Sequence, residues 1–220
     1  MALNVILAGA SGEVGKRILE ELIANNLVTS VHLINRSLHP VQHPKVIQHQ
    51  VNFEQLNTIE NAPNFDLAYC CLGTTIKKAG SKTAFEKVDL HYVCQFAQLV
   101  KQHNCPTFAV ISSIGAHPNK GGFYLETKGR MEENLRKMNW PSLYLFRPSL
   151  LIGKRQEFRL GEHLGALLGK LISPILQRTF HKYKPIEMDL VANAMASLTA
   201  SAELGVTVVE GKDIVNLARK

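Results

Sequence analysis

Short apolar runs alternate with longer amphipathic stretches along this chain of 220 residues. This alternation is typical of repeated βα units, in which helices cover both faces of a parallel sheet. We expect strands near residues 4–8, 31–35, 46–51, 66–71, 107–112, 142–147 and 206–209. We expect helices near residues 13–26, 54–60, 82–103, 123–138, 160–172, 189–201 and 212–219. The sequence therefore predicts an α/β fold with a doubly wound, mostly parallel sheet, formed by residues 1–220 as a single domain.

A glycine-rich turn follows the first predicted strand and precedes the first predicted helix. Its sequence is Gly9-Ala10-Ser11-Gly12-Glu13-Val14-Gly15, with the spacing G-x-x-G-x-x-G. Glycines at these points let the backbone approach a pyrophosphate, and the helix N-terminus offers unpaired N–H donors. A tight turn alone would also use glycine, but the strand before it and the helix after it favour a cofactor site formed by residues 9–15. We therefore predict an NAD(P)-binding Rossmann fold.

The end of the second predicted strand bears on which dinucleotide binds. Asn35 and Arg36 stand there, about 20 residues beyond the glycines, where NAD-binding proteins place an acid against the ribose hydroxyls. This chain has no acid at that point, and an arginine pairs with a 2′-phosphate through charge-assisted hydrogen bonds. The sequence thus favours NADP(H) over NAD(H), with a solvated loop arginine as the alternative interpretation of Arg36.

Two serines end the fifth predicted strand, and a tyrosine and a lysine follow on the next predicted helix. Ser112 and Ser113 lie at the carboxyl end of the strand, where open α/β sheets bind their ligands. Tyr124 and Lys128 are four residues apart, so a helix presents both on one side. In carbonyl reduction a tyrosine hydroxyl donates a proton to the developing alkoxide, and a serine holds the carbonyl oxygen. The pattern predicts an oxidoreductase site, with a helix-surface pair as the alternative for the tyrosine and the lysine.

The lysine has a specific task in this hypothesis. A free tyrosine has a pKa near 10 and is a poor proton shuttle at neutral pH. A nearby ammonium stabilises the phenolate, and Lys128 supplies that charge. A shift of about three units, worth roughly 4 kcal/mol, is within reach of a close cation assisted by the nicotinamide charge of the cofactor.

Composition argues against several other classes of protein. The formal charge of +7 would attract polyanions, but the basic residues are dispersed, so we expect no nucleic-acid partner. No window of about 18 residues is apolar throughout, so we expect no membrane span. The start of the chain has neither a basic segment nor a small-residue cleavage site, which favours a cytoplasmic location. The four cysteines and nine histidines lack ligand spacing, so we expect reduced thiols and no metal site.

Further motifs extend the match to a known family. They are Gly9-Ala10-Ser11-Gly12-Glu13, Cys71-Leu72-Gly73-Thr74-Thr75, Lys78-Ala79-Gly80, Val88-Asp89 with Tyr92, Ser112-Ser113, Tyr124 to Lys128, Phe146-Arg147-Pro148 and Arg155-Gln156-Glu157. In these the chain resembles the atypical short-chain dehydrogenases/reductases related to the oxidoreductase Tat-interacting protein, of which bacteria carry shorter relatives.

The resemblance implies roles for individual residues. Ser113, rather than Ser112, would meet the substrate and be catalytic together with Tyr124 and Lys128, which also contact the cofactor. The remaining cofactor contacts would come from Leu72, Gly73, Thr74, Arg147 and Pro148, and from Asn52 and Phe53 near the adenine. The family usually carries Asp-Phe at the last two positions, so the adenine contact is altered here. Arg155 would anchor substrate, with a solvated arginine as the alternative, and residues 147–188 would form the substrate region.

Two other functions remain open at this stage. The first is a catalytically silent, NADP(H)-sensing protein that binds a protein partner, because members of the family are described as regulators as well as reductases. The second is surface binding through an apolar stripe, for which packing over the sheet is the stronger alternative. The stripe comprises Leu160, Leu164, Leu167, Leu168, Leu171 and Ile172. The leading prediction is an NADP(H)-dependent oxidoreductase for a small carbonyl or alcohol substrate, whose identity the sequence does not specify.

Overall fold

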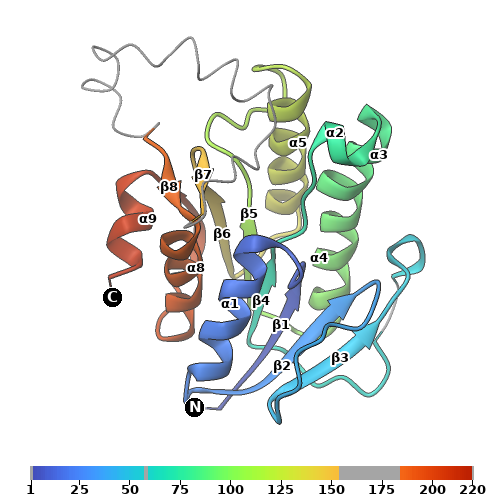
Figure 1. The fold of residues 1–220 in the computed structure, drawn as a ribbon, viewed down its shortest axis with the longest axis vertical. Coiled ribbons are helices and arrows are strands. Elements are labelled where there is room, and N and C mark those ends of the chain that lie inside the picture. Colours follow the sequence, from blue (N-terminus) through green and yellow to red (C-terminus); the bar gives the residue numbers. More distant parts are fainter. Residues whose placement is uncertain (1, 57–58, 154–183, 220) are drawn as a thin grey trace.

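Seven parallel strands form one sheet in the order β3-β2-β1-β4-β5-β6-β9 (Figure 1). The computed structural model describes residues 2–56, 59–153 and 184–219. The strands are β1 Leu3–Ala8, β2 Val28–Asn35, β3 Val46–Gln50, β4 Leu67–Cys70, β5 Thr107–Ile111, β6 Ser142–Arg147 and β9 Gly205–Glu210. Each neighbouring pair is parallel. All seven expected strands and the Rossmann-type sheet are thereby confirmed.

Helices cover both faces of this sheet (Figure 1). On one face lie α1 Glu13–Ala24, α8 Met188–Ala196 and α9 Lys212–Leu217. On the other lie α4 Val93–Gln102 and α5 Phe123–Lys137. The short helices α2 Ile76–Ala79 and α3 Lys82–Glu86 precede α4, and the short turns η1 Phe53–Gln55 and η4 Ser197–Thr199 are 3-10 helices. The two faces define two layers of buried side chains.

Strand β1 shows how the sequence builds these two layers. Val5 and Leu7 pack on the side of α1 and α8, whereas Ile6 and Ala8 pack on the side of α4. All four side chains are fully buried. Because successive side chains of a strand point to opposite faces, a continuous apolar run fits a strand that is covered on both sides.

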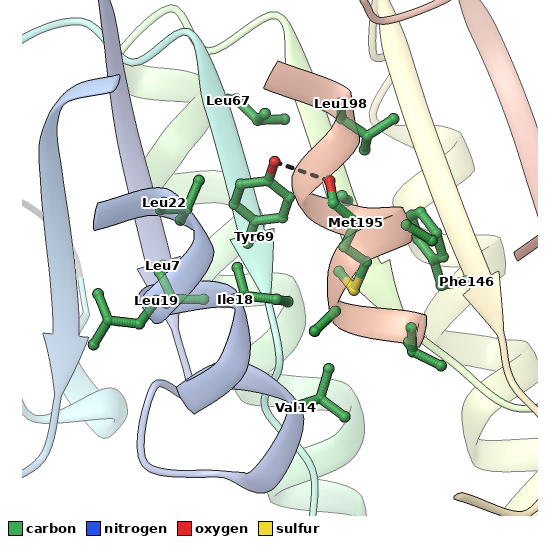
Figure 2. Packing of buried hydrophobic residues seen from close by; sticks show 14 of the residues in the cluster. Leu7, Val14, Ile18, Leu19, Leu22, Leu67, Tyr69, Phe146, Met195 and Leu198 are labelled. Atoms are coloured by element: carbon green, nitrogen blue, oxygen red, sulfur yellow. Dashed lines mark hydrogen bonds between the residues drawn. The ribbon is translucent and has the colours of Figure 1, made fainter. Parts of the chain in front are cut away.

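A buried tyrosine joins the sheet to α8. The hydroxyl of Tyr69 donates a hydrogen bond to the carbonyl oxygen of Met195 at 3.0 Å, and Figure 2 shows both among apolar side chains of α1 and α8. Met195 lies in the last turn of its helix, where carbonyl groups lack partners within the helix. The bond therefore gives the buried Tyr69 hydroxyl a partner at the end of α8.

The structure differs in several places from the helices and strands that the sequence predicts. The helix expected over 54–60 is wrong: the described residues there form only η1, and Asn61 turns the chain with a φ of 55°. The helix expected over 82–103 is interrupted by a π-helical turn, η2 Lys87–Tyr92. A small parallel sheet of β7 Leu151–Ile152 and β8 Ile186–Glu187 was not expected from sequence. The helix expected over 160–172 lies outside the described residues.

Candidate functional site

A cavity of about 560 Å³ lies at the carboxyl ends of the central strands. The glycine turn after β1, the loop after β4, the end of β5 and helix α5 all contribute to its wall. Of the predicted site residues, those lining it are Ser11, Gly12, Glu13, Val14, Gly15, Leu72, Gly73, Thr74, Ser113, Tyr124, Lys128 and Pro148. Parallel strands end at one edge of the sheet, so the fold brings these distant segments together.

The glycine turn is shaped by close backbone packing. Gly9 has a φ of +86°, and a Cβ there would lie 2.6 Å from the carbonyl of Cys71. A Cβ on Gly15 would lie 2.2 Å from the carbonyl oxygen of Gly9. Gly12 begins α1 without a side-chain cap, so amides of its first turn remain available to an anion. The turn thus needs glycine at its first and third positions.

Tyr124, Lys128 and Ser113 line the same wall of the cavity. The Tyr124 ring packs against Phe85 with centroids 5.5 Å apart, which orients the side chain. Burial raises the pKa of Tyr124 above its usual value, although Lys128 and a hydrogen bond with Ser113 act in the opposite direction. Lys128 thus acts on this pKa in the expected direction, but burial outweighs it.

A buried carboxylate also faces Lys128 and adds a smaller upward contribution to the pKa of Tyr124. Asp89 Oδ1 lies 2.7 Å from Lys128 Nζ, and the two side chains are 1% and 4% exposed. The other oxygen, Oδ2, accepts a hydrogen bond from the Thr74 amide at 2.8 Å. Burial alone would lower the pKa of Lys128, but Asp89 and Tyr124 raise it. Burial raises the pKa of Asp89, opposed by Lys128 and the Thr74 amide.

Asp89 was missed as a site residue, although the sequence carries a signal. It stands four residues after Phe85 and four before Val93, both fully buried, so a helix places all three on one stripe. A charged residue on such a stripe needs a buried partner. Asp89 lies in the π turn η2, a type of turn that is frequent at functional sites.

A second buried ion pair lies beside the cavity. Glu132 accepts hydrogen bonds from Arg147 at 2.8 and 2.5 Å, and the hydroxyl of Ser112 donates to it at 2.5 Å. Glu210 accepts another from Arg147 at 3.0 Å. Arg147 was predicted to contact the cofactor, but its guanidinium is engaged by these carboxylates and it does not line the cavity.

The other predicted residues lie away from the cavity wall. Asn52 caps η1 through its side chain, and Phe53 packs on Tyr92 with centroids 5.3 Å apart. Asn35 ends β2 with its Nδ2 buried and without a hydrogen-bond partner. Arg36 is exposed, and no ion pair within the described part of the chain engages it. Gly9 and Ala10 form the turn behind the wall, and Arg155 falls outside the described residues.

A larger hollow of about 720 Å³ lies elsewhere, between α1, α8, α9 and strand β9. Its charged lining side chains are all acidic: Glu21, Glu203 and Asp213. Such a surface repels the phosphates of a dinucleotide, so the smaller cavity is the better candidate. Within residues 2–56, 59–153 and 184–219 there is no cluster of three or more potential metal ligands. In the same part of the chain no helix has the length and apolar character needed to cross a membrane.

Solved structures share this fold at low sequence identity. MoeE5 in complex with UDP-glucose and NAD superposes with a TM-score of 0.69 and 14% identity, covering 98% of this chain and 80% of that one. The human epimerase family protein SDR39U1 with NADPH gives a TM-score of 0.61 and 14% identity, covering 94% and 73%. The fold and the cavity define a protein with a Rossmann-type parallel sheet.

Sequence relatives identify the family within that class. The chain is 40% identical to Protein HTATIP2 of Rattus norvegicus over 167 residues, covering 73% of this chain and 68% of that protein. It is 29% identical to Protein FMP52, mitochondrial, of Debaryomyces hansenii over 161 residues, covering 70% of each. No family model matches the chain. The chain belongs to the HTATIP2 family, which confirms the resemblance to the Tat-interacting oxidoreductases.

These relatives also correct one expectation. A cytoplasmic location was expected because the N-terminus lacks an export signal, but the fungal FMP52 relatives are named as mitochondrial proteins. Secretory signals and mitochondrial targeting segments have different sequence patterns, so an argument about the first does not address the second. The cytoplasmic expectation is therefore wrong.

Proposed function

We propose that this protein is an NADP(H)-dependent oxidoreductase that reduces a small carbonyl compound or oxidises the corresponding alcohol. One observation carries the proposal. Ser113, Tyr124 and Lys128 line the same cavity as the glycine turn of residues 11–15. A proton donor and a dinucleotide-binding turn at a single cavity are the two elements that hydride transfer to a carbonyl requires.

The residues present fit a dinucleotide. Gly9 and Gly15 leave no room for a side chain at the turn, which suits a backbone that approaches a pyrophosphate. The uncapped start of α1 offers amide donors. The buried and unpartnered Nδ2 of Asn35 offers a further donor near the ribose position, where a ligand would relieve the cost of leaving it unpaired.

The preference for NADP(H) depends on Arg36. Its guanidinium is exposed and lies directly after Asn35, where a 2′-phosphate is expected. An arginine there gives the phosphate a bidentate, charge-assisted partner. The neutral Asn35 places no carboxylate against that phosphate.

The chain's own groups would handle the proton. A bound nicotinamide dinucleotide supplies hydride chemistry in this site. The Tyr124 hydroxyl is the proton donor to the substrate oxygen, and the Ser113 hydroxyl holds that oxygen. Lys128 lies one helical turn from Tyr124 on α5, where its positive charge acts on the phenol, and it would also contact the cofactor.

Residues 147–188 are proposed to bind the substrate. Pro148, Ser149, Leu151 and Met188 line the cavity from the two ends of this segment. The pairing of β7 with β8 brings those ends together. Arg155, within the segment, is the proposed anchor for a carbonyl or anionic group.

Calorimetric titration of the purified protein with NADPH and with NADH tests the proposal. We expect NADPH to bind about 10- to 150-fold more tightly, because hydrogen bonds between charged groups contribute about 1.5–3 kcal/mol. Arg36→Ala should remove this preference and leave NADH affinity unchanged. Equal affinity for both cofactors in the wild-type protein contradicts the role of Arg36, and no affinity for either contradicts the proposed function.

A further inference from the structure

A carboxylate lies at the centre of the candidate site, in contact with the lysine that the chemistry uses. Asp89 lines the cavity and is 1% exposed. It binds Lys128 Nζ at 2.7 Å and the Thr74 amide at 2.8 Å. It therefore links helix α5 to the loop that follows β4, and both of these segments line the cavity.

This contact changes the charge that the tyrosine experiences. A buried ammonium by itself would stabilise the phenolate of Tyr124. With Asp89 at 2.7 Å, the effect of the ammonium on the phenol is offset in part by the carboxylate. Burial of the phenol then outweighs what remains, which disfavours ionisation of the hydroxyl.

Other groups around the tyrosine do not restore the positive charge. Burial raises the pKa of Cys70 to about 12, so this thiol beside Lys128 stays neutral. Ser113 is uncharged. Lys78 also lines the cavity but is exposed, so solvent screens its charge. The described groups that face this pair are Cys70 from β4, the Thr74 amide, the Ile111 carbonyl oxygen of β5, and Tyr124 from α5, whose hydroxyl Ser113 contacts.

We propose that Asp89 is a positioning residue that holds and neutralises Lys128, so that Tyr124 enters the reaction as a protonated donor and the site works in the direction of carbonyl reduction. This inference depends on the proposed function, because it concerns the same site. The raised pKa of Tyr124, caused by burial and reinforced by Asp89 against Lys128, agrees with it.

The proton balance explains the direction. In reduction a bound reduced dinucleotide would supply the hydride that the carbonyl carbon gains, and would itself be oxidised. The carbonyl oxygen gains the proton of the Tyr124 hydroxyl, and water reprotonates the phenolate that remains. In oxidation the same tyrosine must start as a phenolate to accept the proton of the alcohol. A site that keeps the phenol protonated at neutral pH therefore favours the first of these two reactions.

The near-ultraviolet absorbance of tyrosinate tests this inference without cofactor or substrate. The ionisation of Tyr124 is isolated by subtracting the titration of Tyr124→Phe from that of the wild-type protein. We expect Tyr124 to ionise only above the ordinary tyrosine value of about 10. A wild-type midpoint below that value overturns the inference, and this measurement needs no Asp89 variant.

The role of Asp89 itself is tested by Asp89→Asn, which keeps an acceptor for the Thr74 amide and removes the charge. Subtracting the titration of Asp89→Asn/Tyr124→Phe again isolates Tyr124. We expect its midpoint to fall by about 1 to 3 pH units, because Lys128 is then unpaired beside the phenol. Adding Lys128→Gln to Asp89→Asn should return the midpoint to the wild-type range or above. An unchanged midpoint in a folded Asp89→Asn protein overturns the inference.

The two proposals fail in different ways. If the protein binds NADPH but Tyr124 titrates identically with and without Asp89, the proposed function stands and the role of Asp89 is wrong. If the titrations behave as expected but no dinucleotide binds, the charge arrangement is correct and the reductive direction falls together with the proposed function.

Discussion

Helix α5 makes two buried ion pairs one turn apart, and they have different surroundings. Lys128 pairs with Asp89 at the wall of the cavity. Glu132, four residues later, pairs with Arg147, and neither of these two residues lines the cavity. Both pairs remove charge from water, which stabilises a fold little compared with apolar packing. Burial of a charge therefore does not by itself mark a functional site. What distinguishes the Lys128–Asp89 pair is that it faces the cavity and Tyr124.

The largest expected effect is a loss of activity, and it should occur only beside the Lys128–Asp89 pair, which lines the cavity. Tyr124→Phe removes the hydroxyl next to Lys128 and should lower turnover of a reducible carbonyl by about 100- to 10,000-fold, the usual contribution of a positioned proton donor. NADPH binding should persist, as measured by calorimetry. Turnover is followed by NADPH oxidation, and a variant as fast as the wild-type protein would show that the proton donor is another group.

The second effect concerns stability. Glu132→Ala leaves the Arg147 guanidinium without its bidentate partner and should lower the free energy of unfolding by about 3–5 kcal/mol, measured by urea denaturation. The matched control is Glu210→Ala, which removes the other carboxylate on the same arginine. Glu210 is 28% exposed against 3% for Glu132, so its loss should cost about 1 kcal/mol or less. Equal losses in the two variants would show that Glu132 has no special structural role.

A third buried polar pair extends the comparison to a neutral case. His32 Nδ1 lies 2.9 Å from His49 Nε2, and burial lowers the pKa of His32 to about 4. The unfolded chain binds a proton near pH 6.5 while the folded chain does not, so stability falls as pH drops from about 6.5 to 4. The expected loss is about 3 kcal/mol. His32→Leu should flatten this dependence in urea denaturation at several pH values; an equally steep loss in that variant would assign the acid sensitivity to other groups.

The smallest expected effect concerns an ion pair at the exposed C-terminal end of helix α5. Lys137 pairs with Glu133 at 2.8 Å, with side chains that are 67% and 48% exposed. Lys137→Ala should change the free energy of unfolding by about 0.5 kcal/mol or less, and salt should reduce the difference further. A loss comparable to that of Glu132→Ala would mean that burial does not separate these pairs.

Much of the fold was predictable because its signals are local. Apolar runs marked all seven strands, and the glycine spacing marked the turn that lines the cavity. The four-residue spacing of Tyr124 and Lys128 was sufficient to place both on one side of a helix. The helix expected over 54–60 failed because the apolar residues Leu56 and Ile59, which suggested a helical face, pack into the core while the described turn there is only the 3-10 turn Phe53–Gln55.

The charge balance of the site was not predictable in the same way. From the sequence, Lys128 was expected to lower the pKa of Tyr124, and Arg147 was expected to contact the cofactor. The structure shows Asp89 on the lysine, Glu132 on the arginine, and burial as the larger influence on the tyrosine. Each partner comes from a different element, and no spacing along the chain reveals such a contact.

The sequence alone determined the seven strands of the main sheet, the glycine turn of residues 9–15 and the shared helix face of Tyr124 and Lys128, because each depends on residues close to one another along the chain. Only the tertiary structure decided which buried charge meets which. Electrostatic interactions depend on separation in space and on the surrounding medium, and the folded sheet sets both when it brings η2, α5 and the strand ends together.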